Sequence, residues 1–209
     1  MDLAVHAHPG YVSAYVGVAQ VVHHDRATVI AHGWLRAMID PEAAPDDYRA
    51  LEAIEVPARA HGENRRLARL TDAYGGSFDV PMAELAPIVA RAPEYTFLDY
   101  LRLLDGMRRG GGPLHEDGLM VTHDFIATRA VLGAPVFFFA GARDFNTSLS
   151  LVRAYVEAIE APYKELVVFE HSAHTPFLAE PERFTDELVR IAGLVSFHAP
   201  ASAPWRTNP

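Results

Sequence analysis

Two short apolar runs in the second half of the chain, separated by one helix-length segment, constrain the fold more than any other feature. Residues 136–140 (VFFFA) form a continuous apolar run rich in aromatic side chains, and residues 166–169 (LVVF) form a second run rich in β-branched ones. Between them, apolar residues recur at the three-and-four spacing of a one-faced helix. These residues are Leu149, Val152, Tyr155, Val156 and Ile159. The order strand, helix, strand predicts a parallel βαβ unit whose strands are buried on both faces.

A titratable residue follows each of the two predicted strands. Asp144 comes just after the first run, and His174 comes after the turn that ends the second. Parallel strands end at the same edge of a sheet, so both residues are expected at the carboxyl edge, where open α/β sheets bind ligands. We predict a hydrogen bond of about 2.6 to 3.2 Å between the two side chains. A carboxylate beside an imidazole fixes its tautomer and supports the imidazolium, and such a pair is the supporting half of a triad of nucleophile, base and acid.

Three segments resemble the α/β-hydrolases, specifically the capped branch close to the proline iminopeptidases. Residues 141–147 (GARDFNT) and 170–184 (EHSAHTPFLAEPERF) resemble the family's acid and histidine loops. Residues 8–20 (HPGYVSAYVGVAQ) resemble the strand after its nucleophile helix. The resemblance implies an α/β fold, namely a partial α/β-hydrolase fold with a short parallel sheet of the last three strands and a helical cap. It also implies hydrolysis of an ester, amide or short peptide, with Asp144 and His174 as catalytic residues.

The resemblance divides the chain into four parts. Residues 1–20 are expected to be the end of the nucleophile helix, within residues 1–7, and the sixth strand, residues 12–19. Residues 21–125 form the helical cap, and residues 126–195 return to the hydrolase core. Residues 196–209, rich in Ala, Ser and Pro, are expected to be a flexible tail. Predicted helices span residues 27–39, 46–61, 64–73, 81–91, 94–108 and 125–132, and another begins at Pro181.

The predicted strand at residues 12–19 has largely apolar residues on both faces, which is typical of an interior strand. The neighbouring strand on one side is not encoded in this sequence. We therefore expect three parallel strands in sequential order, with this one at an edge. An exposed apolar edge favours association between chains, so self-association is expected there.

A nucleophile elbow of the form G-x-S-x-G does not occur in the sequence. The nearest segment is GGSFD at residues 75–79, which keeps one flanking glycine and follows a predicted helix rather than a strand. We therefore assign no nucleophile and expect a truncated, inactive form that retains a triad remnant. The missing elbow, oxyanion loop and earlier strands are expected in the reading frame upstream of Met1.

The composition of the chain limits the classes of partner and the compartment that we expect for it. There are 18 basic and 27 acidic residues and a net charge of −9, which argues against binding nucleic acid. With no cysteine, the chain has neither a disulfide framework nor a thiolate metal site. No apolar run reaches the length of a membrane span, and no signal peptide is evident, so we expect a cytoplasmic protein without membrane contact.

Other polar clusters have simpler interpretations. Histidines occur in pairs at residues 6 and 8, 23 and 24, and 171 and 174, but a zinc site needs further convergent ligands, so no metal and no cofactor is predicted. The RRGGGP run at residues 108–113 is interpreted as a turn. Acidic residues of the predicted cap are candidates to hold a substrate amine, as in iminopeptidases, or to form a solvated face: Glu52, Glu55, Glu94 and Asp99. The alternative function is a noncatalytic module that binds a small molecule or a partner.

Overall fold

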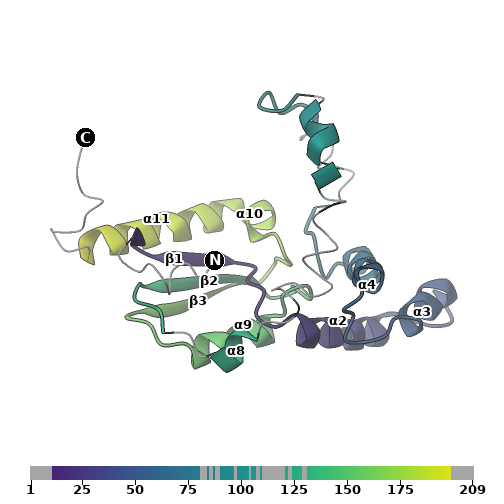
Figure 1. Ribbon diagram of the computed structural model, residues 1–209. Coiled ribbons are helices and arrows are strands. Elements are labelled where there is room, and N and C mark those ends of the chain that lie inside the picture. The colour runs from purple at the N-terminus through teal and green to yellow at the C-terminus, as the bar shows by residue number, and fades with distance from the viewer. Residues whose placement is uncertain are drawn as a thin grey trace.

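The computed structural model describes residues 11–80 and 131–198 throughout (Figure 1). Between these ranges it describes residues 84, 87, 90–96, 98–103, 105–106, 109, 121 and 124–128. The elements, in chain order, are β1 (Tyr15–Val18), α2 (His24–Met38), α3 (Pro45–Glu52), α4 (His61–Ala73), α8 (Phe125–Thr128), β2 (Val136–Gly141), α9 (Leu149–Ala158), β3 (Lys164–Phe169), α10 (Pro176–Ala179) and α11 (Pro181–His198).

The three strands form one parallel sheet in the order β1-β2-β3, which confirms the predicted topology. β2 is the central strand, and its first residue, Val136, is paired with Tyr15 of β1 and with Lys164 of β3. α9 connects β2 to β3, so the predicted βαβ unit is present. The carboxyl ends of β2 and β3 therefore lie at one edge of the sheet.

Every residue of β2 is buried, because helices cover both faces of the sheet. The strand alternation places Phe138 toward α9, where its ring meets Tyr155 at a centroid distance of 5.5 Å. Phe139 faces the other way and meets Phe184 of α11 at 5.4 Å. Figure 1 shows the three resulting layers, with α11 and α10 on one face and α8 and α9 on the other. A continuous apolar strand is what burial on both faces requires.

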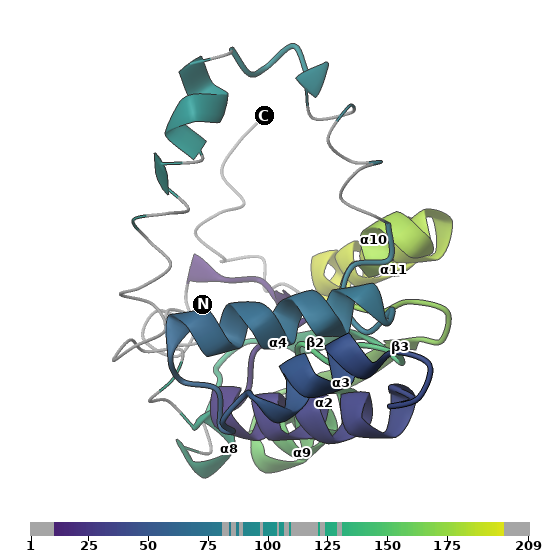
Figure 2. The ribbon, with the colours of Figure 1, turned by 90° about the vertical axis from the view of Figure 1, so that its right-hand side faces the viewer.

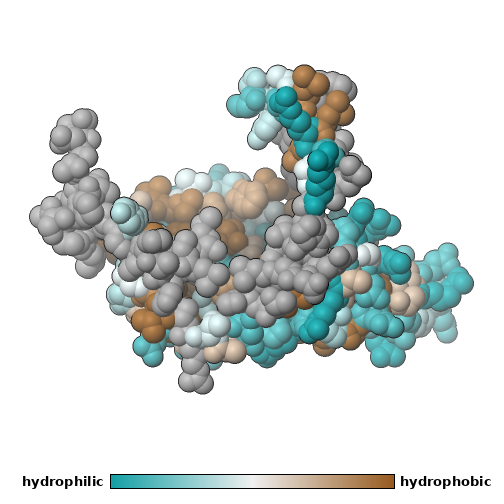
Figure 3. Space-filling model, viewed as in Figure 1, coloured by the Kyte–Doolittle hydropathy of each residue, from teal (hydrophilic) through white to brown (hydrophobic). Residues whose placement is uncertain are grey.

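Helices α2, α3 and α4 form a second apolar core of their own. These helices lie beside the sheet in Figure 1 and face the viewer in Figure 2. The buried residues of this core are Ala31, Leu35, Ile39, Leu51, Ile54, Ala58, Leu67 and Leu70. The outer surface of these helices is mostly hydrophilic, whereas hydrophobic side chains are visible over α10 and α11 (Figure 3). The predicted cap region therefore contains a packed helical unit whose apolar residues face inward.

The observed strands differ from the predicted ones at their ends. β1 begins at Tyr15 rather than at residue 12, because Tyr15 is paired with the first residue of β2 and the residues before it have no partner strand in the described structure. β3 begins at Lys164, two residues earlier than predicted, because Lys164 is also paired with the first residue of β2. Strand length here follows from pairing rather than from apolar character.

Several helix boundaries also differ. The predicted helix 46–61 is wrong, since α3 ends at Glu52 and α4 begins at His61. Pro57 lies between them and has no backbone N–H for a helix. α2 begins at His24, three residues earlier than predicted.

Two further boundaries differ near the sheet and at the C-terminal end. α8 ends at Thr128 instead of residue 132, and α11 continues to His198, into the range predicted as tail. The first proline after α11 is Pro200, so no helix breaker stands at residue 196. The predicted helix 1–7 and residues 199–209 lie outside the described residues, as does most of the predicted helix 81–91. Of the predicted helix 94–108, residues 98–103 and 105–106 are helical, and residues 97, 104, 107 and 108 are outside the described residues.

Candidate active site

Asp144 and His174 lie beside each other at the carboxyl edge of the sheet. Asp144 follows β2 and His174 follows β3, and these neighbouring strands are parallel. The Nδ1 atom of His174 is 3.0 Å from Oδ2 of Asp144. The contact predicted from the sequence is therefore confirmed at the predicted distance.

The Asp144 carboxylate is held in place by the loop that follows it. Its side chain is 1% exposed. Oδ1 accepts hydrogen bonds of 2.8 Å from the backbone N–H groups of both Asn146 and Thr147, and Oδ2 accepts one of 2.5 Å from the Thr147 hydroxyl. A buried carboxylate that accepts several hydrogen bonds has a fixed orientation. Oδ2 is thereby aimed at the imidazole.

The acceptor on Asp144 determines which nitrogen of His174 carries the proton. An ionised carboxylate only accepts hydrogen bonds, so Nδ1 donates to Asp144 and Nε2 is left as the basic nitrogen. Burial by itself lowers the pKa of His174, but the hydrogen bond and charge of Asp144, together with the charge of Asp79, outweigh burial and raise the pKa above its usual value. The pair therefore favours the imidazolium.

The raised pKa predicts a pH-dependent contribution of His174 to stability. The folded protein binds the proton more tightly than the unfolded chain, so the stabilisation is fully present below the unfolded pKa of about 6.5 and is lost as pH rises through the folded pKa. The free energy of unfolding, measured by urea titration from mildly acidic to alkaline pH, should fall less over this range in His174→Gln than in the wild type. The effect of His174→Gln on this pH-dependent fall should be smaller when Asp144 is already replaced by Asn. An equal effect with and without Asp144→Asn would contradict the role of Asp144.

The GGSFD segment at residues 75–79 lies against both loops of the pair. Ser77 is 2% exposed, and its hydroxyl accepts a hydrogen bond of 2.6 Å from Asn146 Nδ2. Its carbonyl oxygen accepts one of 2.8 Å from the backbone N–H of His174. Ser77 thus lies near the pair as a bonded structural group, without a preceding strand to make it an elbow.

Sequence reasoning missed Asp79 and Asn146, which both contact the loops of the candidate pair. Asn146 bonds Ser77, and Asp79 bonds the histidine loop at Ala173 and Thr175. An aspartate between two predicted helices carries no local signal of such contacts. The nearest signal is the position of Asn146 two residues after Asp144, which by itself indicates only a helix cap.

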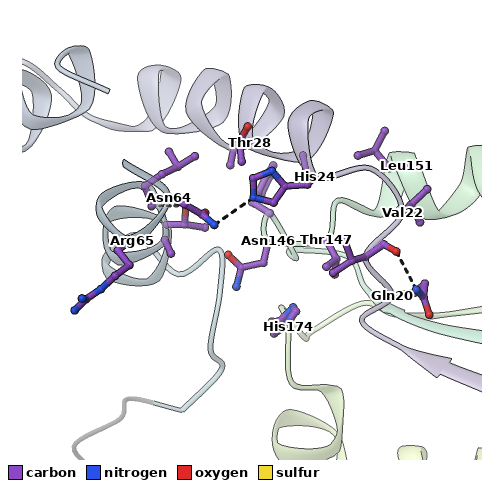
Figure 4. Close-up of a pocket in the computed structure, with 17 residues that line it drawn as sticks. Gln20, Val22, His24, Thr28, Asn64, Arg65, Asn146, Thr147, Leu151 and His174 are labelled. Carbon is purple, nitrogen blue, oxygen red and sulfur yellow. Dashed lines mark hydrogen bonds between the residues drawn. The ribbon is translucent and has the colours of Figure 1, made fainter. Parts of the chain in front are cut away.

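A cavity of about 290 Å³ opens beside the pair, between α2, α4 and the two loops. His174, Asn146 and Thr147 line it on one side, and His24 and Asn64 line it on the other. Asn64 Nδ2 lies 3.2 Å from His24 Nε2, and Figure 4 shows these two side chains pointing toward each other. Burial is the main reason that the pKa of His24 is lowered, so this ring is neutral at neutral pH.

The remaining lining of the cavity is largely apolar, with Arg65 as its charged residue among the described ones. The apolar residues are Val21, Val22, Ala27, Ala31, Leu67, Ala68, Phe145 and Leu151. In Figure 4 the Arg65 side chain extends away from His24 and His174. An apolar wall with a few convergent polar groups is the usual character of a small-molecule site.

The acidic residues proposed for amine binding do not line this cavity in the described structure. Glu52 is paired with Arg36 at 3.2 Å, and Asp99 accepts a hydrogen bond of 2.6 Å from the Thr96 hydroxyl. Both are surface contacts. Glu55 and Glu94 are exposed.

The sequence pairs of histidines do not stay together at the cavity. His24 faces the cavity, whereas His171 is exposed. Among the described residues, no three His, Cys, Asp or Glu side chains lie close enough together to hold a metal ion. His6 and His8, like residues 110–113 of the RRGGGP run, are outside the described residues. None of the helices that the structure describes has the length and apolar character needed to cross a membrane.

Comparison with known proteins places this geometry in a fold class. The chain resembles the crystal structure of proline iminopeptidase from Mycobacterium smegmatis with a TM-score of 0.61 and 17% identity, covering 95% of this chain and 62% of that one. It resembles the crystal structure of VinJ with a TM-score of 0.56 and 14% identity, covering 93% and 62%. The chain therefore has a partial α/β-hydrolase fold.

Sequence comparison adds a more local similarity. A stretch of 58 residues is 38% identical to the probable aminopeptidase YbaC of Bacillus subtilis (strain 168), which is 28% of this chain and 18% of that protein. No protein-family model matches the chain. The chain thus spans less than two thirds of each solved structure, and the sequence match covers under a fifth of the aminopeptidase.

Proposed function

We propose that this chain carries the acid and the base of a serine-type hydrolytic site, with Asp144 as the acid and His174 as the base. The supporting observation is the 3.0 Å contact between His174 Nδ1 and a buried carboxylate, on the wall of a cavity at the carboxyl edge of a parallel sheet. The reaction is hydrolysis of an ester or amide bond, which this pair catalyses when a serine hydroxyl is the nucleophile.

In this mechanism His174 acts through Nε2 while its Nδ1–H remains bonded to Asp144. Nε2 removes the serine hydroxyl proton as the serine oxygen bonds to the substrate carbonyl carbon. The imidazolium then gives that proton to the leaving alcohol or amine as its bond to carbon breaks, and an acyl-serine remains. Water attacks the acyl group in the same way, and the acid product is released. Asp144 stays ionised and stabilises the imidazolium at each step.

The cavity beside His174 is the proposed substrate site. Its apolar wall suits the acyl part of a small ester, amide or short peptide, and His24, Asn64 and Asn146 offer neutral hydrogen-bonding groups. Two similar proteins are named as an aminopeptidase and a proline iminopeptidase, which supports an amide or peptide substrate.

The nucleophile is proposed to come from residues outside these 209. None of the chain's serines lies in a G-x-S-x-G segment, and Ser77, the nearest in pattern, is held by Asn146. We propose that the 209-residue chain alone is therefore inactive, since both the attacking oxygen and the oxyanion donors of an elbow are lacking.

Labelling with a fluorophosphonate tests this proposal. The purified 209-residue chain and the longest product of the same reading frame are treated with the probe, and adducts are counted by intact-protein mass spectrometry. We expect no adduct on the short chain and one adduct on the longer product, at the serine of a G-x-S-x-G segment. Stoichiometric labelling of the short chain would overturn the proposal that it is inactive.

The same experiment distinguishes the hydrolytic function from the alternative, a noncatalytic binding module. If the longer reading frame encodes no elbow and its product takes up no probe, the acid and base have no nucleophile to serve. A noncatalytic module that binds a small molecule in the cavity would then be the better interpretation.

A further inference from the structure

The segment at residues 76–79, called here the bridging segment, joins the two loops of the candidate pair. The Gly76 carbonyl oxygen accepts a hydrogen bond of 2.9 Å from the backbone N–H of Phe145, next to Asp144. One residue later, the Ser77 carbonyl oxygen accepts the backbone N–H of His174 at 2.8 Å. The bridging segment follows α4, so one short stretch contacts the acid loop, the histidine loop and the end of a helix that lines the cavity.

Asp79 makes the largest set of contacts in this segment. Its side chain is 3% exposed. Oδ1 accepts the backbone N–H of Ala173 at 2.6 Å, and Oδ2 accepts both the backbone N–H and the hydroxyl of Thr175 at 3.0 Å. The guanidinium of Arg143 lies 3.7 Å from Oδ1. A buried carboxylate with charge-assisted bonds to two backbone N–H groups holds them strongly.

Together these contacts hold three consecutive backbone donors. Ala173 and Thr175 donate to Asp79, and His174 between them donates to Ser77. We propose that Asp79 is a positioning residue for His174, which fixes the backbone on both sides of the histidine so that the imidazole stays on Asp144. Its catalytic consequence rests on the function proposed above, whereas the positioning itself does not.

The two carboxylate oxygens explain why an aspartate suits this position. Each oxygen faces a backbone donor, so both must be acceptors. In Asp79→Asn one oxygen becomes an NH₂ group that faces an N–H, and a buried donor is left without an acceptor. In Asp79→Glu the charge is kept, but the added methylene moves the carboxylate out of register. The two variants therefore distinguish the effect of the position of the Asp79 carboxylate from the effect of its charge.

The His174 ring has several charged neighbours that a titration must consider. Asp144 and Asp79 both raise its pKa through their charges, against the lowering effect of burial. Arg143 is paired with Asp79, and Glu180 bonds the same loop at the His171 N–H. A loss of charge alone would lower the His174 pKa in Asp79→Asn but leave it in Asp79→Glu.

NMR titration of the ¹⁵N-histidine-labelled 209-residue chain tests the proposal without any need for a nucleophile. The measured quantities are the His174 pKa and the downfield resonance of the Nδ1 proton bonded to Asp144. We expect Asp79→Asn and Asp79→Glu both to lower the pKa and to broaden or abolish that resonance. Glu180→Gln is the matched control, because Glu180 bonds the loop at His171 and Ser172 rather than beside His174, and it should leave both signals unchanged.

A second measurement needs no variant and so does not depend on the variants folding. In the wild type, the amide protons of residues 173–175 should exchange slowly with solvent, because all three have acceptors in the bridging segment. Fast exchange at these amides would overturn the proposal, as would an Asp79→Glu variant with an unchanged Nδ1 resonance and pKa.

The fluorophosphonate experiment tests the proposed function, and the NMR experiment tests the positioning role of Asp79, so one can fail without the other. If the longer product takes up no fluorophosphonate, the NMR result still decides whether Asp79 positions His174. If it is labelled, Asp79→Glu in the longer product should lower kcat on the order of 10²-fold with little change in KM, because a misplaced base weakens the transition state more than substrate binding. A change confined to KM would contradict positioning.

Discussion

Replacement of His174 by alanine is expected to lower kcat on the order of 10⁴-fold or more in the longer product of the reading frame, in which we propose that the serine nucleophile lies. The reason is that His174 is the imidazole bonded to Asp144 among the described residues, and the other acceptor positions of that carboxylate are filled by the loop that follows it. The measurement is steady-state hydrolysis of an activated ester, followed by burst kinetics to separate acylation from deacylation.

His171→Ala is the matched control for this experiment. His171 lies three residues away in the same loop and is exposed. Its backbone N–H donates to Glu180, and its carbonyl oxygen accepts from Arg143, and both of these backbone contacts survive the substitution. We expect nearly unchanged kcat. Equal losses in the two variants would show that the loop, not the base, was damaged.

Asp144→Asn should approach the effect of His174→Ala. An amide at this position can present its NH₂ group to Nδ1, which then becomes the acceptor and leaves the proton on Nε2, where the serine needs a base. Retention of more than about a tenth of wild-type kcat would argue against the proposed triad.

The parts of the fold that could be predicted are those whose signal is local. A buried parallel strand is an uninterrupted apolar run, and residues 136–140 and 166–169 are such runs. Once both strands and the helix between them are assigned, the right-handed parallel connection brings Asp144 and His174 to one edge. The contact between residues 30 positions apart thus follows from topology.

What could not be predicted depends on residues that are distant in the sequence. Asp79 contacts Thr175 across 96 positions, and no periodicity marks either residue as a partner of the other. The contact between His24 and Asn64 spans 40 positions and joins two helices of the second core. Such contacts depend on how helices pack, which the apolar pattern of each helix leaves open. The side of the cavity lined by His24 and Asn64 could therefore not be predicted, although the sequence predicts helices at residues 27–39 and 64–73.

Gly141→Ala is expected to destabilise the protein by about 3 kcal/mol and to separate the acid from the base. A Cβ atom at Gly141 would lie 1.9 Å from the carbonyl oxygen of Ala173 and 2.5 Å from that of Ser172. Both are backbone atoms of the histidine loop, so no side chain can rotate away to make room. The overlap is relieved only if the end of β2 and the loop before His174 move apart.

That movement would break the contacts that join the two loops. The backbone N–H of Arg143 donates to the carbonyl oxygen of Ser172 at 3.0 Å, and Asp144 bonds His174 at 3.0 Å. The expected result is a lower urea midpoint with an unchanged m-value, together with loss of the downfield Nδ1 proton of His174. Gly33→Ala is the matched control, since nothing lies within 4 Å of its added Cβ and it is inside α2. Alanine there should raise stability by up to about 1 kcal/mol. If Gly141→Ala were as stable as Gly33→Ala and kept the Nδ1 resonance, the close packing of the two strand ends, on which the candidate active site depends, would be wrong.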